Sequence, residues 1–521
     1  MLARAHTGSL IGIEAHPVIV EASHGKGLPG VVLVGLARGA VRESIVRVRA
    51  ALSACGFSLG NHRVVINLLP AELPKEASAL DLPLAMALLA ASGHLPKSAL
   101  RGRRFFGELS LGGRVEAVRG AVLVADLARR EGDGEVFVPT PNADEAAIIP
   151  GVQSRGVDHL ASLVAHLRDE ISIAPTKPTY QAGAGKAPCL SEVRGQRAAK
   201  RAVTIAAAGG HNLLFVGPPG SGKTMLARRL PGLLPALNAD ECIEVTRIHS
   251  AAGALHRTSL LREPPFRAPH HTASDVALCG GGSNPRPGEI TLAHRGVLFL
   301  DELPEFSRRA LESLREPLEE RAINIARAAT SLRFPADVLF VAAMNPCPCG
   351  KFRPLGDKPQ RISCLCNAEQ IQRYRSRISG PLLDRIDLHV YVDALPFRDF
   401  SRGDDGETSE VIRGRVALAR DEQYERLGDG RLNAGMDHEA IQRTVNLDDA
   451  MLTLIEGAIE RYDLSARAIQ RVLKVARTIA DLNGEPEVNA EHLNEALGFR
   501  VIRPESDLDH RSNGESVVKS A

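Results

Sequence analysis

The sequence predicts a multidomain α/β protein, with a parallel β-sheet at its core and an almost wholly helical C-terminal part. Three observations predict this fold. The chain has 521 residues, which is too long for one hydrophobic core. Short apolar runs of strand length alternate with helical patterns up to about residue 396. Residues 408–500 then have an almost wholly helical pattern.

The chain divides into three predicted domains. Residues 1–168 combine strand-like runs such as VVINLL and EVFVP with alanine-rich helical patterns such as Leu82–Ala91, which indicates an α/β domain. The stretch from Ile173 to Pro188 is rich in Pro, Gly and Ala, and it therefore predicts a linker. The predicted boundaries are 1–168 for this domain, 169–189 for the linker, 190–396 for the α/β core, 397–502 for the helical domain and 503–521 for a disordered charged tail.

The composition is that of an ordinary soluble protein, with 44% hydrophobic and 24% charged residues. The net charge of +2 gives no bulk electrostatic argument for nucleic acid, so such contacts would need local patches. No apolar run approaches the roughly 18 residues that span a bilayer, and the N-terminus lacks the apolar centre of a signal peptide. We therefore expect a cytoplasmic protein with no membrane partner, whose eight cysteines are reduced thiols or metal ligands rather than disulfides.

The stretch NLLFVGPPGSGKTMLARRL, residues 212–230, predicts a phosphate-binding loop. A strand-length apolar run precedes the glycines and an amphipathic helix follows them, and a chance Gly/Pro turn would not show this order. Backbone N–H groups at the helix N-terminus wrap the phosphates, Lys223 reaches the outer phosphates and the Thr224 hydroxyl binds magnesium. The predicted ligands of ATP and Mg²⁺ in the loop are Gly217, Pro218, Pro219, Gly220, Ser221, Gly222, Lys223 and Thr224.

Two further apolar runs end in polar side chains. The run from Val297 to Leu300 predicts a buried parallel strand that delivers Asp301 and Glu302 at its carboxyl end, where ligands of open α/β sheets bind. We expect Asp301 in the magnesium shell and Glu302 as the residue that orients or deprotonates the attacking water. The run VLFVAAM places Asn345 after another buried strand, either as a sensor of the γ-phosphate or as a cap of the next turn. The residues alone favour the cap.

Five motifs in this chain resemble those of one family. They are the phosphate loop, GVLFLDELPEF, MNPCPCG, SGPLLDRIDLHV and LSARAIQRVLKVARTIADL. Together they are similar to the magnesium-chelatase-like AAA+ ATPases, and within these to the YifB/ComM family, over nearly the whole chain. The resemblance implies an AAA+ core with a C-terminal helical lid, and an N-terminal domain similar to that of Lon proteases. It also implies a homo-oligomeric ring, usually a hexamer, in which one subunit completes the active site of its neighbour.

The resemblance also assigns two arginines. Arg385 in SGPLLDRIDLHV matches the arginine that reaches across the subunit interface to the γ-phosphate, a role that suits a permanently charged, forked guanidinium. A local salt bridge to Asp384 or Asp387 is the alternative. Arg467 matches the lid arginine that contacts the phosphates of its own subunit, whereas the residues alone favour a solvated helix face. The expected catalytic residues are therefore Lys223, Glu302, Asn345 and Arg385.

Two segments indicate what such a ring acts on. RAINIARAATSLRFPAD alternates apolar and basic residues about a small-residue turn, which predicts a β-hairpin carrying Arg327 and Arg333. In related AAA+ helicases, a hairpin of this kind and an insert such as that from Phe266 to Arg295 face the central pore. Cations there can grip the phosphates of single-stranded or branched DNA. A solvated hairpin face, or a set of interface salt bridges that includes Arg321, is the alternative.

Four cysteines form two C-x-C pairs with fourteen residues between them. They are Cys347, Cys349, Cys364 and Cys366. Four thiolates suit a tetrahedral, structural zinc ion, but the pairs are tighter than the usual C-x₂-C, so four reduced cysteines in a surface loop are the alternative. The other four cysteines are expected to be ordinary small residues. His270 and His271 are adjacent and would point to opposite faces of a strand, so we expect packing or backbone contacts rather than metal binding.

The N-terminal runs GELSLGGRVEAVRG and VFVPTPNADEAA resemble the peptidase domain of Lon-type proteases. The nucleophile of those proteases falls in PKEASALD, residues 74–81, where Ala79 takes the serine position and Ser78 lies one residue early. Ala77 stands where a glycine is usual, and Gly112 precedes the second glycine of the Lon-like turn. We therefore expect a non-proteolytic domain that organises the ring or contacts DNA or a partner. A shifted register would restore Ser78.

Taken as a whole, the resemblance implies an ATP-dependent hexameric DNA translocase or helicase. Its ComM branch promotes branch migration in recombination during natural transformation, which implies DNA and recombination proteins as partners. The alternative is a magnesium-chelatase-like motor ATPase that remodels a protein partner, although that subunit normally lacks a Lon-like domain. An ATP-dependent protease is the third interpretation, which Ala79 disfavours.

Overall fold

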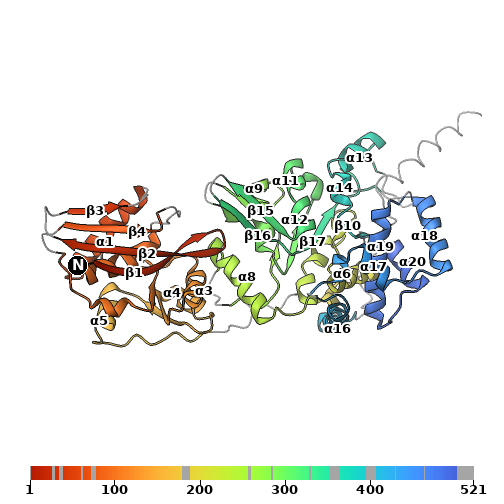
Figure 1. Cartoon of the computed structure of the whole chain (residues 1–521). Helices are drawn as coiled ribbons and strands as arrows, with labels where there is room; N and C mark the ends of the chain where they lie inside the picture. The colour runs from red at the N-terminus through yellow and green to blue at the C-terminus, as the bar shows by residue number, and fades with distance from the viewer. Residues whose placement is uncertain are drawn as a thin grey trace, which may run out of the picture. The chain divides into compact units, whose positions relative to one another are not determined.

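The structure is a computed structural model that divides into two compact units (Figure 1). It describes residues 2–25, 30–34, 39–59, 63–71, 78–178, 188–255, 260–282, 285–327, 330–352, 364–394, 406–428, 430–462 and 464–500. Unit 1 comprises Met1–Ala184, Asn238–Arg262 and Gly281–Pro287. Unit 2 comprises Gly185–Leu237, Glu263–Gly280 and Gly288–Ala521. The predicted disordered tail lies outside the described residues.

Unit 1 is built on a seven-stranded sheet of order β3-β4-β2-β1-β5-β8-β9. The strands are β1 Leu2–Ile11, β2 Glu14–Gly25, β3 Gly30–Val34, β4 Arg63–Leu69, β5 Arg103–Phe105, β8 Glu135–Pro139 and β9 Gln153–Val157. The short strands β6 Glu108–Leu109 and β7 Val115–Glu116 form a separate ribbon, and β13 is Arg286–Pro287. β1 and β2 form an antiparallel hairpin, whereas β5, β8 and β9 are parallel. The sheet is therefore mixed.

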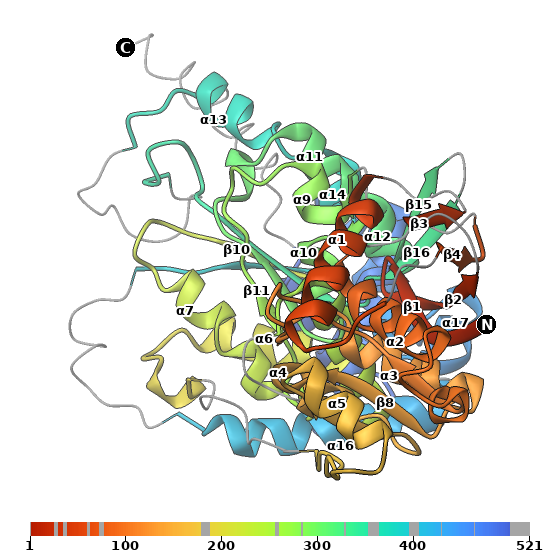
Figure 2. The ribbon, with the colours of Figure 1, turned by 90° about the vertical axis from the view of Figure 1, so that its left-hand side faces the viewer.

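Helices cover both faces of this sheet. They are α1 Gly39–Ala54, α2 Asp81–Ala91, α3 Ala121–Glu131, α4 Thr140–Ala146, α5 Leu160–Leu167 and α8 Ala239–Ala252. Strand β8 shows the two faces, because Phe137 packs into the core of α1, α2 and α5, while Val136 and Val138 pack into the core of α3 and α4. Every residue of α2 is buried, since this apolar helix packs against both β1 and α1, as its place in Figure 2 shows.

Helix α8 belongs to unit 1, although the predicted boundaries place it in the 190–396 core. Ile243 and Ala251 of α8 pack into the apolar core around α3, so side-chain burial rather than chain order decides its unit. Part of the predicted linker, residues 169–189, also packs against unit 1. Ile173 packs against the core of unit 1, and Thr176 N donates to Ser154 O at 2.7 Å. Residues 179–187 of that linker lie outside the described part.

Unit 2 contains a five-stranded parallel sheet of order β11-β14-β17-β10-β18. Its strands are β10 Leu213–Val216, β11 Phe266–Arg267, β14 Val297–Leu300, β17 Leu339–Met344 and β18 Leu388–Tyr391. The helices around it are α6 Arg197–Gly209, α7 Lys223–Ala227, α9 Asp275–Cys279, α10 Glu289–Leu292, α11 Arg308–Ser313, α12 Arg315–Glu320, α13 Ala368–Arg375 and α14 Gly380–Leu383. All residues of β10, β14 and β17 are buried, as expected for central parallel strands.

The C-terminal part is helical, as predicted. Its helices are α16 Ser409–Leu427, α17 His438–Thr444, α18 Asp449–Tyr462, α19 Ala466–Asn483 and α20 Ala490–Gly498. In Figure 1 they gather beside α6, and one continuous apolar core joins them to the sheet. The lid and the sheet therefore lie in the same compact unit, and the boundary between residues 396 and 397 stays a prediction.

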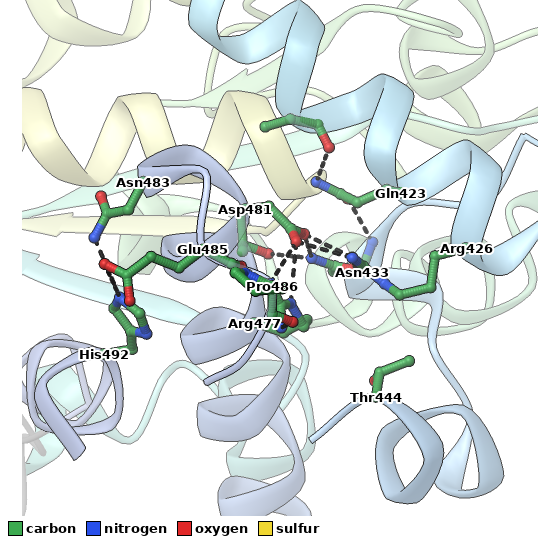
Figure 3. Close-up of polar contacts among 12 residues, drawn as sticks. Gln423, Arg426, Asn433, Thr444, Arg477, Asp481, Asn483, Glu485, Pro486 and His492 are labelled. Carbon is green, nitrogen blue, oxygen red and sulfur yellow. Dashed lines mark hydrogen bonds and ion pairs between the residues drawn. The ribbon is translucent and has the colours of Figure 1, made fainter. Parts of the chain in front are cut away.

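A buried polar network fixes the lid helices to one another (Figure 3). The Asp481 carboxylate accepts from Arg477 Nε at 3.0 Å, Arg426 Nη2 at 2.7 Å and Asn433 Nδ2 at 2.7 Å. The Arg477 side chain is 1% exposed, and Gln423 donates from α16 to Ala208 O of α6. Because these charges are buried, the network specifies one packing of the lid and penalises the loss of any partner.

Candidate ATP site and its neighbours

The phosphate loop connects β10 to α7, as its sequence predicts. Gly222 is the residue before α7 and has φ +96°, a conformation that residues with a side chain rarely adopt. The Lys223 ammonium donates to Gly217 O at 2.8 Å, Pro218 O at 2.9 Å and Asn345 Oδ1 at 3.3 Å. Burial lowers the pKa of Lys223, and the charges of Asp301 and Glu302 oppose that shift. The cation is therefore held inside the loop.

The magnesium ligands predicted from the sequence lie together. Thr224 Oγ1 donates to Asp301 Oδ2 at 2.7 Å. The contact forms because β14, which ends just before Asp301, is separated from β10 by β17 alone, and all three strands are parallel. Their carboxyl ends, and hence Asp301, Asn345 and the phosphate loop, share one edge of the sheet. A hydroxyl, a carboxylate and a buried ammonium at this edge fit a triphosphate with Mg²⁺.

Glu302 stands beside this cluster in an unusual backbone conformation. Its φ of +53° lies in the left-handed region, which is uncommon for a residue with a side chain. Its Oε2 is 3.3 Å from His271 Nδ1. His271 follows β11, the strand that pairs with β14, and its ring centroid is 4.1 Å from that of His270. The sequence did not predict this partner of Glu302, because only the pairing of β11 with β14 brings the two residues together.

Arg385 lies at the opposite edge of the same sheet. β10 and β18 are parallel neighbours with Leu213 opposite Leu388, so Arg385 precedes the sheet at the edge where β10 begins. Asn212 Nδ2 donates to Arg385 O at 2.8 Å, which fixes that place. The guanidinium donates to Glu319 and, at 3.0 Å, to Arg315 O. This contact differs from the salt bridge to Asp384 or Asp387 that was the alternative to a role across the subunit interface.

Asp387 is engaged elsewhere. Arg471 Nη1 of α19 donates to it at 2.6 Å, and His211 Nδ1 lies 3.2 Å from its other oxygen. The carboxyl is fully buried, and although burial raises its pKa, His211 and Arg471 outweigh that effect and hold the pKa well below its usual range. Asp387 therefore ties the sheet to the lid and is not available to Arg385.

The four predicted zinc ligands converge just beyond Asn345. Their Sγ atoms all lie within 4.8 Å of one another. Cys347 Sγ is 3.3 Å from Cys349 Sγ and 3.6 Å from Cys364 Sγ, and the last two are 3.5 Å apart. Most of the intervening loop, residues 353–363, lies outside the described part.

Residues 189–400 match the family described as magnesium chelatase, subunit ChlI, residues 20–142 match subunit ChlI of Mg-chelatase, and residues 406–500 match its C-terminal family. The chain is 42% identical over 502 residues to the uncharacterized protein YifB of Escherichia coli, covering 96% of this chain and 97% of the relative. It is 42% identical over 507 residues to the competence protein ComM of Haemophilus influenzae, covering 96% and 98%. It is also 43% identical over 503 residues to the uncharacterized protein Rv2897c of Mycobacterium tuberculosis, covering 96% and 98%.

The chain belongs to the YifB/ComM family of magnesium-chelatase-like AAA+ ATPases. Membership implies an ATPase that uses ATP and Mg²⁺, in agreement with the cluster at the phosphate loop. No helix among the described residues is long and apolar enough to cross a membrane.

The remaining residues expected from the family occupy defined positions. Arg467 is exposed on the first turn of α19, one turn before Arg471. β15 (Ala322–Arg327) and β16 (Thr330–Pro335) form the predicted antiparallel hairpin. Arg333 is exposed on this hairpin, opposite Asn324, whereas Arg321 at its base pairs with Asp337 at 3.4 Å. The side chain of Arg327 lies outside the described part.

Ala79, which takes the serine position in the expected Lon-like domain, lies in the interior of unit 1 of this YifB/ComM family member. Ala79 is 6% exposed, its side chain packs into the α3 core, and its carbonyl accepts from Gly107 N at 3.1 Å. Ala77 and the side chain of Ser78 lie outside the described part. The absence of proteolysis stays a prediction.

Proposed function

We propose that this chain is an ATP-dependent DNA translocase that forms a ring, a hexamer as in related ATPases, and promotes branch migration in recombination during natural transformation. The observation that carries the proposal is the position of Arg385 at the sheet edge opposite the phosphate loop. Because Arg385 lies far from its own phosphate site, it can act only on the site of a neighbour, and repeated head-to-tail sharing closes a ring. The 42% identity to a competence protein supports DNA as the partner.

In this proposal each polar residue at the site has one role. Lys223 neutralises charge on the outer phosphates, Thr224 and Asp301 hold Mg²⁺, and Glu302 orients or deprotonates the attacking water. Asn345 senses the γ-phosphate, since its amide already contacts the Lys223 ammonium. Arg467 contacts the phosphates from the lid, and Arg385 stabilises the transition-state charge in the adjacent subunit. ATP bound with Mg²⁺ supplies the phosphoanhydride that is hydrolysed.

The hairpin gives a route from hydrolysis to DNA. Glu319, which holds Arg385, lies in the last turn of α12, and β15 begins two residues after that helix ends at Glu320. A pull on the exposed Arg333 is therefore transmitted to α12 and to Glu319. A contact between Arg333 and the phosphates of DNA is electrostatic and independent of the DNA sequence. We include in this proposal that the protein acts in the cytoplasm and that recombination proteins are among its partners.

The test is strand exchange on a four-way DNA junction. Wild type is expected to move the branch point only with ATP, whereas Lys223→Ala does not. The proposal fails if wild type has no such activity or if Lys223→Ala keeps it.

Arg333→Ala should lose DNA stimulation of ATP hydrolysis while keeping the DNA-free rate. Arg443→Ala, which removes an exposed arginine of α17, is the matched control and should behave as wild type.

A motor ATPase that remodels a protein partner is the second candidate, favoured by the match of 189–400 to a magnesium-chelatase subunit. An ATPase rate that rises with a protein partner but not with single-stranded or branched DNA would favour it. An ATP-dependent protease is the third, and casein cleavage that is lost on Ser78→Ala would support it.

A further inference from the structure

We propose that Cys347, Cys349, Cys364 and Cys366 bind one structural Zn²⁺, and that this ion holds Asn345 and the phosphate loop in the geometry that ATP hydrolysis needs. The inference rests on the ATPase part of the proposed function and not on DNA.

The thiols are arranged for a metal ion rather than for a disulfide. The Sγ atoms of Cys347, Cys349 and Cys364 are separated by 3.3, 3.5 and 3.6 Å. A tetrahedron with Zn–S bonds of about 2.3 Å has S···S edges of about 3.8 Å, whereas a disulfide bond is about 2.05 Å long. Cys366 completes the set within 4.8 Å. Four thiolates leave no open position for substrate, so the role of the ion is structural.

Backbone and packing contacts support this cluster, as they do around metal ligands generally. Phe352 N donates to Cys347 Sγ at 3.3 Å, and Gly350 N donates to Cys347 O at 2.9 Å, which closes a tight turn. Ile371 of α13 is fully buried against the cysteines. Arg375, at the end of α13, donates to Pro346 O at 3.1 Å. The cluster therefore joins the end of β17 to α13, two segments that residues 345–367 separate in the chain.

The turn touches the ATP site at two points. Cys347 follows Asn345 by two residues, so fixing its sulfur fixes the strand end that carries the amide. Gly350 lies directly on Pro219 of the phosphate loop, because a Cβ added at Gly350 would lie 2.5 Å from Pro219 Cδ. Its φ of +74° also favours glycine. Loss of the ion would let both contacts drift, and a misplacement of about 1 Å at a catalytic site costs about a hundredfold in rate.

The first experiment measures the metal in the full chain. Purified wild type should contain about one zinc per chain, and Co²⁺ in its place should give the visible absorption of a tetrahedral thiolate site. The Cys364→Ser/Cys366→Ser double variant should lose both. Cys55→Ala, which removes a cysteine of unit 1, is the control and should keep both. Wild type without zinc and without the Co²⁺ spectrum overturns the site.

The second experiment separates the ion from its effect on hydrolysis. Gly350→Ala keeps all four thiols but clashes with Pro219, so it should keep its zinc and lose at least about tenfold in kcat for ATP. The cysteine double variant should lose a similar factor in kcat while still binding a fluorescent ATP analogue, which also shows that it is folded. Full ATPase activity in zinc-free protein, or in Gly350→Ala, overturns the coupling. Wild type that binds zinc but hydrolyses no ATP contradicts the proposed function and leaves the metal site standing.

Discussion

Completion of the ATP site by the arginine of a neighbour can be tested by mixing two inactive variants. Arg385→Ala keeps its own phosphate loop but cannot help its neighbour, whereas Glu302→Gln keeps its arginine but cannot hydrolyse ATP. The sheet explains why Arg385 cannot act within its own chain. It precedes β18 at one edge, the phosphate loop follows β10 at the other, and a four-residue strand alone is about 13 Å long.

The expected effect is large, because an arginine of this kind stabilises the transition-state charge. Alone, Arg385→Ala should lose about a thousandfold or more in hydrolysis rate, as other enzymes do without such an arginine. In a mixture of equal amounts, an interface is active only where an Arg385→Ala subunit supplies the intact phosphate site and a Glu302→Gln subunit supplies the arginine. Each of these two subunits occupies its place with a probability of about one half, so about one interface in four should become active.

The assay is single-turnover ATP hydrolysis, because one site can hydrolyse its bound ATP once without coordination between the subunits of the ring. The variants are mixed, allowed to exchange subunits and compared with the unmixed preparations. Glu302→Gln mixed with Lys223→Ala is the control, since both keep Arg385 and neither has an intact site. A mixture no faster than the mean of its separate components would refute the reasoning. So would an Arg385→Ala variant that keeps more than about a tenth of the wild-type rate.

Three further predictions follow from contacts in the structure. His271→Ala should raise the DNA-free ATPase rate by up to about fivefold in a steady-state assay, because it frees Glu302 from a partly exposed contact of at most about 1 kcal/mol. Asp481→Asn should lower the free energy of unfolding of unit 2 by about 3 kcal/mol or more in urea denaturation, because it leaves the buried Arg477 cation without its carboxylate. Burial raises the pKa of Glu145 from 4.5 to about 7, so the folded state binds the extra proton and the stability of unit 1 falls as pH rises from 4.5 to 7. Glu145→Gln should therefore stabilise unit 1 at pH 8, by up to about 3 kcal/mol, and change little at pH 4.

The first two of these predictions have a control variant, and the third has an outcome that would contradict it. His270→Ala should change the ATPase rate less than His271→Ala does, since the His270 ring contacts Thr272 and His271 but not Glu302. Glu456→Gln, which removes an exposed carboxylate of α18, should not change the urea midpoint. Equal losses for Glu456→Gln and Asp481→Asn would contradict the charge argument. A pH profile of unit 1 stability that Glu145→Gln does not alter would remove Glu145 as its cause.

The sequence was sufficient wherever a function depends on residues close together in the chain. The phosphate loop could be predicted because strand, glycines, Lys223 and helix follow one another within about 20 residues. The helical lid could be predicted from its periodicity, and the β15–β16 hairpin from alternation about a short turn. The paired spacing of the cysteines likewise indicated a candidate metal site before the structure brought the thiols together.

The tertiary structure decided every contact that depends on the order of strands in a sheet. The position of β17 between β10 and β14 places Asp301 beside Thr224, and the pairing of β11 with β14 brings His271 to Glu302. The parallel pairing of β10 with β18 places Arg385 and its own phosphate loop at opposite ends of the strands, and packing against α3 draws α8 into unit 1. The physical reason is that local propensity and spacing act over a few turns of chain. Strand order and helix partners are instead chosen by burial of apolar surface between distant segments, which no single stretch of sequence specifies.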